Sequence, residues 1–134
     1  MHRFIENVKY DVAVYPRALT TATLVSGSGV DMAKYNNFCA LAGAAPSSQC
    51  GALNIFIAQS TDNSTFSATY LATASVASST TVGFGTSVEI RAEQMSDGYR
   101  YLRVEVLPIA GTQHVIGAAS LRFNSRYPQA SLPA

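Results

Sequence analysis

The segment YRYLRVEVLP, residues 99–108, carries the pattern that decides the fold class. A leucine and two valines occupy every second position, and Arg103 and Glu105 lie between them. Because successive side chains of a β-strand point to opposite faces, this alternation predicts a strand with one buried and one outward face. Glu105, and by the same pattern Glu89, are expected on outward faces, in cross-strand ion pairs with Arg103 and Arg91.

The same alternation recurs along most of the chain. Strands or broken strands are predicted over residues 9–16, 21–32, 36–43, 52–60, 65–72, 86–92 and 114–123. In the first of these, Tyr10, Val12 and Val14 are expected to share one face. About eight strands with turn residues between them are typical of an all-β domain, so we predict a single antiparallel β-sandwich or jelly-roll-like domain.

Three segments depart from this alternation. Residues 91–98 are the one helical candidate, a turn or two that ends at a glycine. Residues 73–87 are rich in small polar residues, and we interpret them as an extended hairpin or a loop. The hexapeptide STDNST, residues 60–65, contains an Asp-Asn pair that favours a tight turn. Asn63 also begins a glycosylation sequon, but a match this short leaves the plain turn as the preferred interpretation.

The composition limits the partners of the chain. Its 134 residues suit one domain, and 13% of them are charged, against a usual share of about 25%. The net charge is +1 and the only lysines are Lys9 and Lys34, so no basic cluster predicts a nucleic-acid partner. No apolar stretch approaches the ~20 residues that cross a bilayer, so no membrane partner is expected. The opening MHRFIENVKY does not match a signal peptide, which predicts synthesis in the cytoplasm.

The two cysteines are predicted to be reduced thiols. Cys39 and Cys50 lie in a chain that is expected to be made in the cytoplasm, where disulfides are rare. A disulfide that closes the loop between them is the alternative. His2 and His114 are remote from both cysteines in the sequence, so a zinc site has no obvious set of four ligands and no metal is expected.

No catalytic constellation is recognisable. The sequence has no Gly-x-Ser-x-Gly motif and no phosphate-binding loop, and its carboxylates are scattered without a spacing that pairs them. We therefore predict that the chain is not an enzyme, that it has no catalytic residue and that it binds no cofactor.

The two ends of the chain differ from its middle. We predict an N-terminal arm or edge strand over residues 1–20, the β-sandwich domain over residues 21–128 and a C-terminal tail over residues 129–134. The arm is expected to dock on a partner without completing the core, and the alternative is an edge strand of the chain's own sheet. Aromatic, aliphatic and arginine side chains in these ends resemble binding hot spots. The candidate partner-contact residues are Arg3, Phe4, Ile5, Tyr10, Tyr15, Arg17 and Tyr127.

Several motifs in this order are similar to those of a known family. The series is LVSGSGVDMAKYNNFCALAG, LNIFIAQSTDNSTFSAT, YRYLRVEVLPIAGT and VIGAASLRFNSRYP. It resembles the capsid decoration proteins of tailed bacteriophages, also called cement or auxiliary proteins, over residues 22–128. The matching positions are Val30, Asp31, Met32, Tyr35, Gln59, Ser60, Asp62, Asn63, Thr65, Phe66, Arg100, Tyr101, Leu102, Arg103, Val104, Pro108, Arg126, Tyr127 and Pro128.

The resemblance implies a structural role and no catalysis. It implies a β-rich domain that binds the major capsid protein on the outer surface of the virion, as a homotrimer, and stabilises the assembled capsid. Two alternatives remain open at this point. One is another virion role, in head–tail joining or in the tail. The other is a carbohydrate-binding module on the virion surface, with Phe84, Tyr99 and Tyr101 as its aromatic platform.

Overall fold

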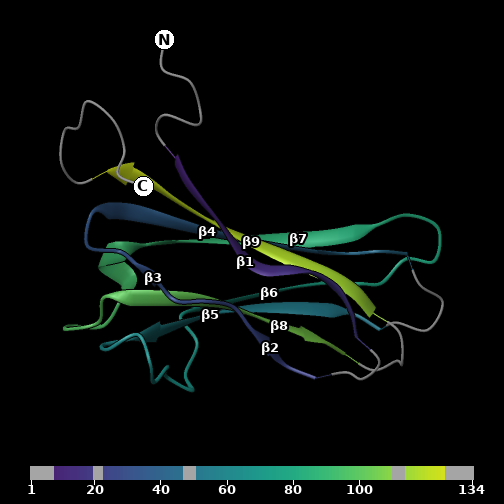
Figure 1. The fold of residues 1–134 in the computed structure, drawn as a ribbon, viewed down its shortest axis with the longest axis horizontal. Coiled ribbons are helices and arrows are strands. Elements are labelled where there is room, and N and C mark those ends of the chain that lie inside the picture. The colour runs from purple at the N-terminus through teal and green to yellow at the C-terminus, as the bar shows by residue number, and fades with distance from the viewer. Residues whose placement is uncertain (1–7, 20–22, 47–50, 110–113, 126–134) are drawn as a thin grey trace, which may run out of the picture.

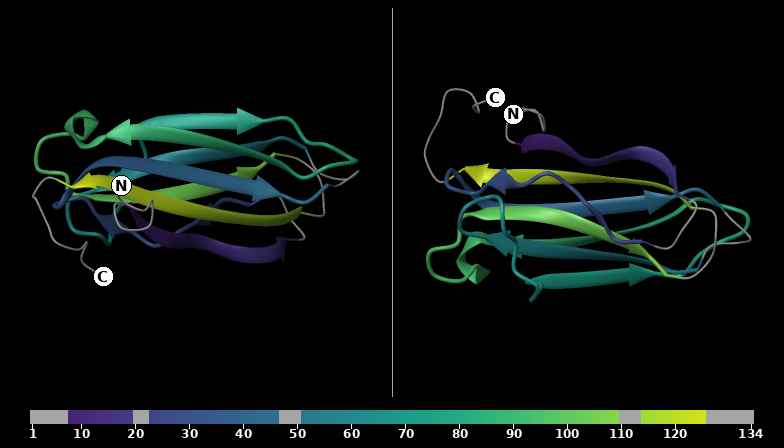
Figure 2. Two further views of the ribbon diagram at one scale, coloured as in Figure 1. Left: turned by 90° about the horizontal axis from the view of Figure 1, so that it is seen from above. Right: turned by 60° about the horizontal axis from the view of Figure 1, so that its bottom comes forward.

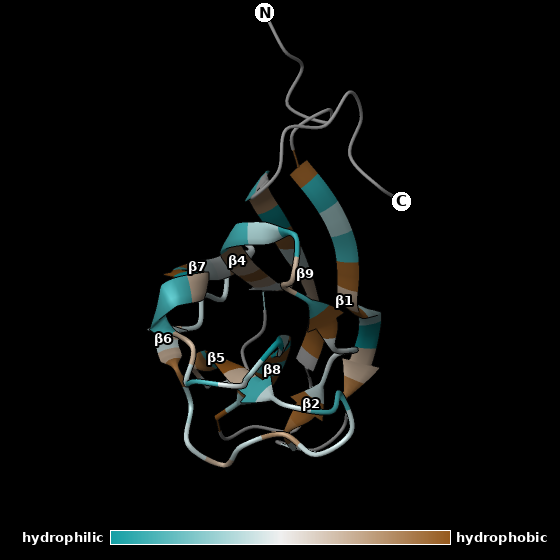
Figure 3. Ribbon diagram, turned by 90° about the vertical axis from the view of Figure 1, so that its left-hand side faces the viewer, coloured by the Kyte–Doolittle hydropathy of each residue, from teal (hydrophilic) through white to brown (hydrophobic). Residues whose placement is uncertain are grey.

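Two antiparallel β-sheets pack face to face in the computed structural model, which describes residues 8–19, 23–46, 51–109 and 114–125 (Figure 1). The strands are β1 (Val8–Leu19), β2 (Val25–Ser26), β3 (Val30–Asp31), β4 (Tyr35–Ala44), β5 (Leu53–Ser60), β6 (Ala72–Val76), β7 (Phe84–Arg91), β8 (Tyr101–Pro108) and β9 (His114–Ser125). One 3-10 turn, η1 (Ala92–Gln94), follows β7. A view along the strands shows the two sheets as two layers (Figure 3).

The strand order is that of a jelly roll. The first sheet, here the β1-sheet, has the order β1-β9-β4-β7. The second, here the β8-sheet, has the order β2-β8-β5-β6, and β3 also pairs with β8. The first strand therefore pairs with the last, β2 and β3 with β8, β4 with β7, and β5 with β6. A long antiparallel hairpin that is folded over on itself has this pairing, so the predicted jelly-roll-like sandwich is confirmed.

Alternate side chains of both sheets form the core. Leu102, Val104 and Val106 are each at most 1% exposed, which confirms the alternation predicted for β8. Other large side chains that are fully buried are Met32, Phe38, Leu53, Ile55, Ile57, Ile90 and Ile116. Burial of this apolar surface between the two sheets is the main force that stabilises the fold.

β1 is an edge strand of the chain's own sandwich. It pairs with β9 from Val8 to Leu19, and the buried side chain of Val14 belongs to the core. The expectation that the arm does not complete the core is therefore wrong for residues 8–19, and the alternative of an in-domain edge strand is the one observed. Residues 1–7 lie outside the described part of the chain.

Two irregularities in β1 change which side chains face the core. The register with β9 shifts between Val12 and Val14 and again between Val14 and Arg17. Each shift inserts an unpaired residue, which reverses the inward and outward alternation beyond it. Val14 is 4% exposed, whereas Tyr10 is 58% and Val12 is 53% exposed. The prediction that Tyr10, Val12 and Val14 share one face is therefore wrong.

Arg122 of β9 ties the two sheets together near the start of β1. Its guanidinium forms an ion pair with Asp11 of β1, with 3.0 Å between Nη2 and Oδ2. It also donates from Nη1 to the carbonyl oxygen of Asp31 in β3, at 2.9 Å. Asp11 belongs to the β1-sheet and Asp31 to the β8-sheet. The side chain of Arg122 therefore links β1 and β9 to the other layer. Asp31 is held in turn by Arg100, which donates to both of its carboxylate oxygens.

The broken strand predicted over residues 21–32 is confirmed, and the strand predicted over residues 65–72 is wrong. β2 and β3 are two short pieces that flank residues 27–29. A Cβ atom on Gly29 would lie 1.8 Å from Oδ1 of Asn63, so any larger residue would displace side chains of the loop of residues 61–71. That loop crosses the outer face of the β8-sheet, and β6 begins only after it.

The two remaining irregular segments differ from their predictions, the first in length and the second in pairing. The helical candidate over residues 91–98 is the single turn η1, in which Oε1 of Gln94 accepts a hydrogen bond from the Arg91 amide. Residues 73–87 hold β6 and the beginning of β7, which belong to different sheets, so they are not a hairpin within one sheet.

Because of the register shift in β1, a charged substitution should destabilise the fold strongly at Val14 and only slightly at Val12. Replacing Val14 by Asp should lower the free energy of unfolding by about 3–5 kcal/mol, because it buries an uncompensated charge. Replacing Val12 by Asp should change it by less than about 0.5 kcal/mol, because this side chain faces solvent. Urea unfolding of the two variants and the parent measures both effects. Equal losses at the two positions would contradict the observed register.

Candidate docking surfaces

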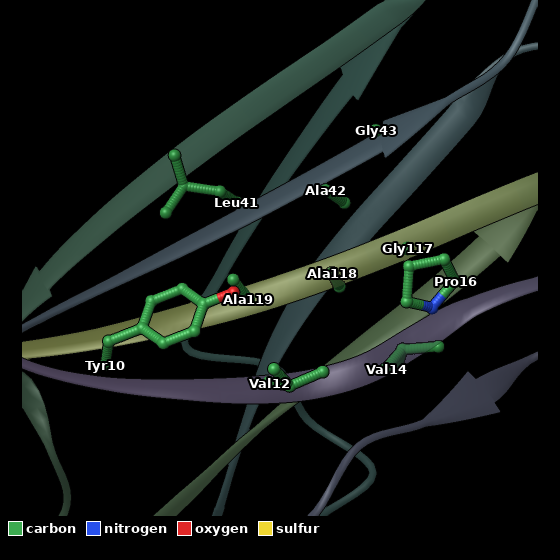
Figure 4. A pocket seen from close by; sticks show the side chains of 10 residues that line it. All are labelled: Tyr10, Val12, Val14, Pro16, Leu41, Ala42, Gly43, Gly117, Ala118 and Ala119. Atoms are coloured by element: carbon green, nitrogen blue, oxygen red, sulfur yellow. The ribbon is translucent and has the colours of Figure 1, made fainter.

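An apolar groove runs over the outer face of the β1-sheet (Figure 4). Its volume is about 320 Å³. Ten residues, here called the sheet groove, line it: Tyr10, Val12, Val14, Pro16, Leu41, Ala42, Gly43, Gly117, Ala118 and Ala119. Three of them, Val14, Ala42 and Ala118, are at most 8% exposed and also belong to the core. Figure 4 shows Val12 of β1 on one side and Leu41 of β4 on the other, with β9 between them and the ring of Tyr10 over β9.

The groove is a consequence of side-chain size across three strands. Val12 of β1 and Leu41 of β4 both lie opposite Ala119 of β9, so the three side chains point to the same face. A small residue between two larger ones leaves a furrow. The furrow continues at Gly43 and Gly117, which are also paired with each other. A Cβ atom would meet its nearest neighbour at 3.6 Å on Gly43 and 3.5 Å on Gly117, so the fold has room for side chains that these positions lack.

The groove carries no charge, whereas the neighbouring part of the same sheet is polar. None of the ten lining residues is charged. Nδ2 of Asn124 donates to Oδ1 of Asn37 at 3.0 Å, and Nδ2 of Asn37 donates to Oε1 of Glu89 at 3.2 Å. Arg91 forms an exposed ion pair with Glu93 at 3.2 Å. The face therefore combines an apolar half with a hydrogen-bonded polar half.

A second apolar surface lies at one end of the sandwich. Four exposed apolar side chains, here called the loop end, belong to residues at or next to the strand ends at one end of the sandwich: Leu24, Val82, Ile109 and Val115. Figure 2 shows this end of the two sheets. Their exposed fractions are 44%, 62%, 43% and 51%. Exposed apolar side chains that cluster in this way often mark a surface that binds another protein.

Of the candidate contact residues, Tyr10, Tyr15 and Arg17 lie in the described part of the chain. Tyr10 lines the sheet groove. Tyr15 is 63% exposed, and the guanidinium of Arg17 lies 5.1 Å from the centre of its ring. Arg3, Phe4, Ile5 and Tyr127 lie outside the described residues. The exposed side chains of the loop end were missed by sequence reasoning, because single apolar residues in loops have no periodicity that would distinguish them.

Unlike the β1-sheet, the β8-sheet is covered on its outer face. The ring of Phe66, in the loop of residues 61–71, lies 4.2 Å from the guanidinium of Arg103. Tyr70 of the same loop stacks on Phe56, with 4.4 Å between the ring centres. The rings of Phe66 and Tyr70 therefore cover the part of this face around Arg103 and Phe56. Among the described residues, all exposed large apolar side chains except Tyr15 belong to the sheet groove or the loop end.

Of the two predicted ion pairs, the pair of Glu105 with Arg103 forms, but within one strand, and the pair of Glu89 with Arg91 does not form. Glu105 is only 3% exposed and pairs with Arg103 of its own strand, at 3.4 Å, and it accepts a hydrogen bond from Ser26 at 3.3 Å. The alternation was right for β8, but the outward face is covered, so an outward side chain is buried. Glu89 accepts a hydrogen bond from Asn37 instead of pairing with Arg91.

The turn predicted over residues 60–65 is confirmed, and a network around one carboxylate holds it. Asn63 has a φ of 61°, in the left-handed region that asparagine tolerates. Oδ1 of Asp62 accepts hydrogen bonds from the amides of Ser64 and Thr65, both at 2.9 Å. These bonds to Thr65 and Ser64 stabilise the charged form and lower the pKa of Asp62 from 3.8 to about 2.

Cys39 lies on the outer face of the β1-sheet and is a free thiol. Burial raises its pKa, and the negative charge of Glu89, which is paired with it across the strands, raises it further. Cys50 lies outside the described residues. Among the residues that the structure does describe, no group of three or more histidine, cysteine or acidic side chains is placed to hold a metal ion. In the same part of the chain, no helix has the length and apolar character to cross a bilayer.

The aromatic platform proposed for a carbohydrate does not form. Phe84 begins β7 at the loop end and is 9% exposed, as part of the core. Tyr101 begins β8 at the opposite end of the sandwich, in the other sheet. Tyr99, Tyr101 and Phe84 are thus not one flat strip.

Comparison with known proteins identifies relatives by fold alone. No protein family and no curated protein sequence matches the chain. Among solved structures it is similar to the PBSX exported protein XepA, with 18% identity and a TM-score of 0.62 over 94% of this chain and 40% of that one. The infectious bursal disease virus VP2 subviral particle has 15% identity and a TM-score of 0.57, over 94% of this chain and 35% of that one. Broad bean stain virus has 11% identity and a TM-score of 0.54, over 94% of this chain and 93% of that one.

These comparisons define the class of fold. The chain is an antiparallel jelly-roll sandwich of the kind found in those proteins. It spans less than half the length of the XepA and VP2 chains that it matches, and it covers nearly the whole of the broad bean stain virus chain.

The Asp62 network predicts a defined loss of stability in acid. The pKa of Asp62 is lower in the folded chain than its ordinary value, so the charged form stabilises the fold. This contribution is present above pH 4 and should be lost as the pH falls from about 4 to about 2. An Asp62→Asn variant should be less stable than the parent at pH 7 and should show a shallower decline in that range. Urea unfolding at a series of pH values measures the difference, and equal slopes would contradict the assignment.

Proposed function

We propose that the chain is a structural protein of a virus particle, which binds the outer surface of the assembled capsid and stabilises it. The observation that carries the proposal is the uncharged apolar surface at the loop end of a jelly-roll domain. Two sources of support are independent of it. The sequence motifs resemble those of phage decoration proteins, and the fold is shared with proteins of virus particles.

The surface chemistry suits attachment to a protein shell. Leu24, Val82, Ile109 and Val115 offer apolar contact area without a charge to desolvate. Tyr15 and Arg17, near the same end of β1, add an exposed aromatic ring and a guanidinium, a pair that is common in binding hot spots. Attachment through apolar contacts also depends little on salt, since ionic strength screens charges.

The partner that this proposal requires is the major capsid protein. Many copies of the chain on one shell would each contact several subunits, and contacts held together in this way add through their high effective concentration. A homotrimer, as the resemblance implies, would add contacts between copies. The activity is one of binding, and no catalytic step is part of it.

A role in head–tail joining or in the tail is the second candidate. It uses the same fold and the same kind of apolar surface, and it differs in where the protein lies on the particle. Copies spread over the capsid in electron micrographs favour decoration, and copies confined to one vertex or to the tail favour the second candidate.

Binding to capsids should depend on the loop end. Capsids assembled without this protein, from the virus that encodes it, should retain the parent chain when they are sedimented. Replacing Val82 and Ile109 by Glu should weaken this binding roughly 30-fold or more, since loss of a hot spot of about 2 kcal/mol has that effect. Electron microscopy of the pelleted particles shows where the bound copies lie.

Ser75→Glu is a matched control, because Ser75 is an exposed residue of β6, outside both apolar surfaces. It adds the same charge and should bind as the parent does. A parent chain that fails to bind such capsids would overturn the proposed function, and equal binding by the loop-end variant would overturn the assigned surface.

A further inference from the structure

We propose that the sheet groove binds a second copy of this chain, with the two β1-sheets packed face to face about a two-fold axis. The inference goes beyond the proposed function, because it concerns the chain alone and a surface that shares no residue with the loop end. It follows from the shape, the charge and the extent of this face, and from the form of the β1 edge.

The first argument is shape. A two-fold interface brings the same patch of each copy together, so that patch must carry both a projection and a hollow. The sheet groove has both: Tyr10, Val12 and Leu41 project, Ala119 lies between Val12 and Leu41, and Gly43 and Gly117 extend the furrow along the strands without side chains. A ridge of one copy can enter the furrow of the other, as side chains do between the packed sheets of a sandwich.

The second argument is charge. A charged residue close to a two-fold axis faces its own copy, and the like charges repel. No residue of the sheet groove is charged, so this repulsion is absent where the copies meet. Around the groove, Asn37, Glu89 and Arg91 supply hydrogen-bonding groups and charges of both signs. An apolar centre with a polar margin is the usual composition of a protein interface.

The third argument excludes one rival arrangement. A second copy could in principle extend the β1-sheet by pairing with the free edge of β1. That edge is interrupted by two register shifts and by Pro16, which has no amide hydrogen to donate. Bulges and prolines are the features that keep an edge strand from pairing with another chain. A second copy is therefore expected to bind the face of the β1-sheet and not the edge of β1.

The extent of the face sets the expected strength. Four strands about 4.8 Å apart and about ten residues long, at ~3.3 Å per residue, give it roughly 600 Å². Two copies would then bury roughly 1,200 Å² in total, the lower limit for specific interfaces. We therefore expect a reversible dimer with a dissociation constant in the micromolar range.

Sedimentation equilibrium of the purified chain tests the proposal. From about 1 µM to about 500 µM, a range that spans a micromolar dissociation constant, the mass should rise from one chain to two. Val12→Glu and Leu41→Glu should each weaken association roughly 30-fold or more. The double variant Gly43→Ala, Gly117→Ala fills the furrow with two methyl groups that the fold has room for, and it should weaken association about tenfold.

Val82→Glu is the matched control for charge, because it lies at the loop end and should associate as the parent does. Circular dichroism and thermal melting confirm that each variant is folded. If a glutamate variant does not fold, the glycine variants keep the test complete, because they add only a methyl group each.

Three results would overturn the proposal: a mass of one chain at every concentration, a mass of three chains, or association that the groove variants leave unchanged. A mass of three chains would favour the trimer that the resemblance implies. Because no capsid is present, failure of this test leaves the proposed function standing, and failure of capsid binding leaves the dimer standing.

Discussion

The pairing of β1 with β9 is the constraint on which both the core and the exposed surface of the β1-sheet depend. The register shift between Val12 and Val14 turns Val14 into the core and leaves Tyr10 and Val12 on the outer face. A regular strand would place all three on one side. The same irregularities, together with Pro16, interrupt the free edge of the sheet. The irregularities of β1 therefore have three consequences. Val14 joins the core, the edge of β1 is interrupted, and Tyr10 and Val12 line one side of the sheet groove.

The two outer faces of the sandwich differ in how far a loop of the chain covers them. On the β8-sheet, the loop of residues 61–71 brings its aromatic rings over Arg103 and Phe56, so Glu105 is buried beneath it. On the β1-sheet, none of the described residues forms a comparable loop over the sheet groove, and exposed apolar side chains are present there and at the loop end. The sheet groove and the loop end share no residue, and the two proposals assign a different partner to each. This separation is what a small structural protein needs if it is to contact both a shell and its own copies.

Sequence reasoning succeeded where one face of a strand was buried along its whole length. β4, β5, β7 and β8 were predicted from alternation, and the turn at Asp62 from its residue types. It failed over residues 65–72, where aromatic residues that favour a strand pack through their side chains onto a sheet. It also failed for the exposure of Glu105, because a polar residue on an outward face is indistinguishable in sequence from one that a distant loop covers. In both cases tertiary contacts overrode local preference.

The sequence by itself determined the class of fold, because a period of two along a strand is a local property that one buried face imposes. It also determined the tight turn, since asparagine at position 63 tolerates the left-handed backbone that the turn requires. Only the tertiary structure decided which strands are neighbours and what the outer faces offer. Val12, Leu41 and Ala119 form one row across three strands although they are far apart in the chain. The groove is a property of that row, and strand pairing between distant segments leaves no local pattern from which it could be read.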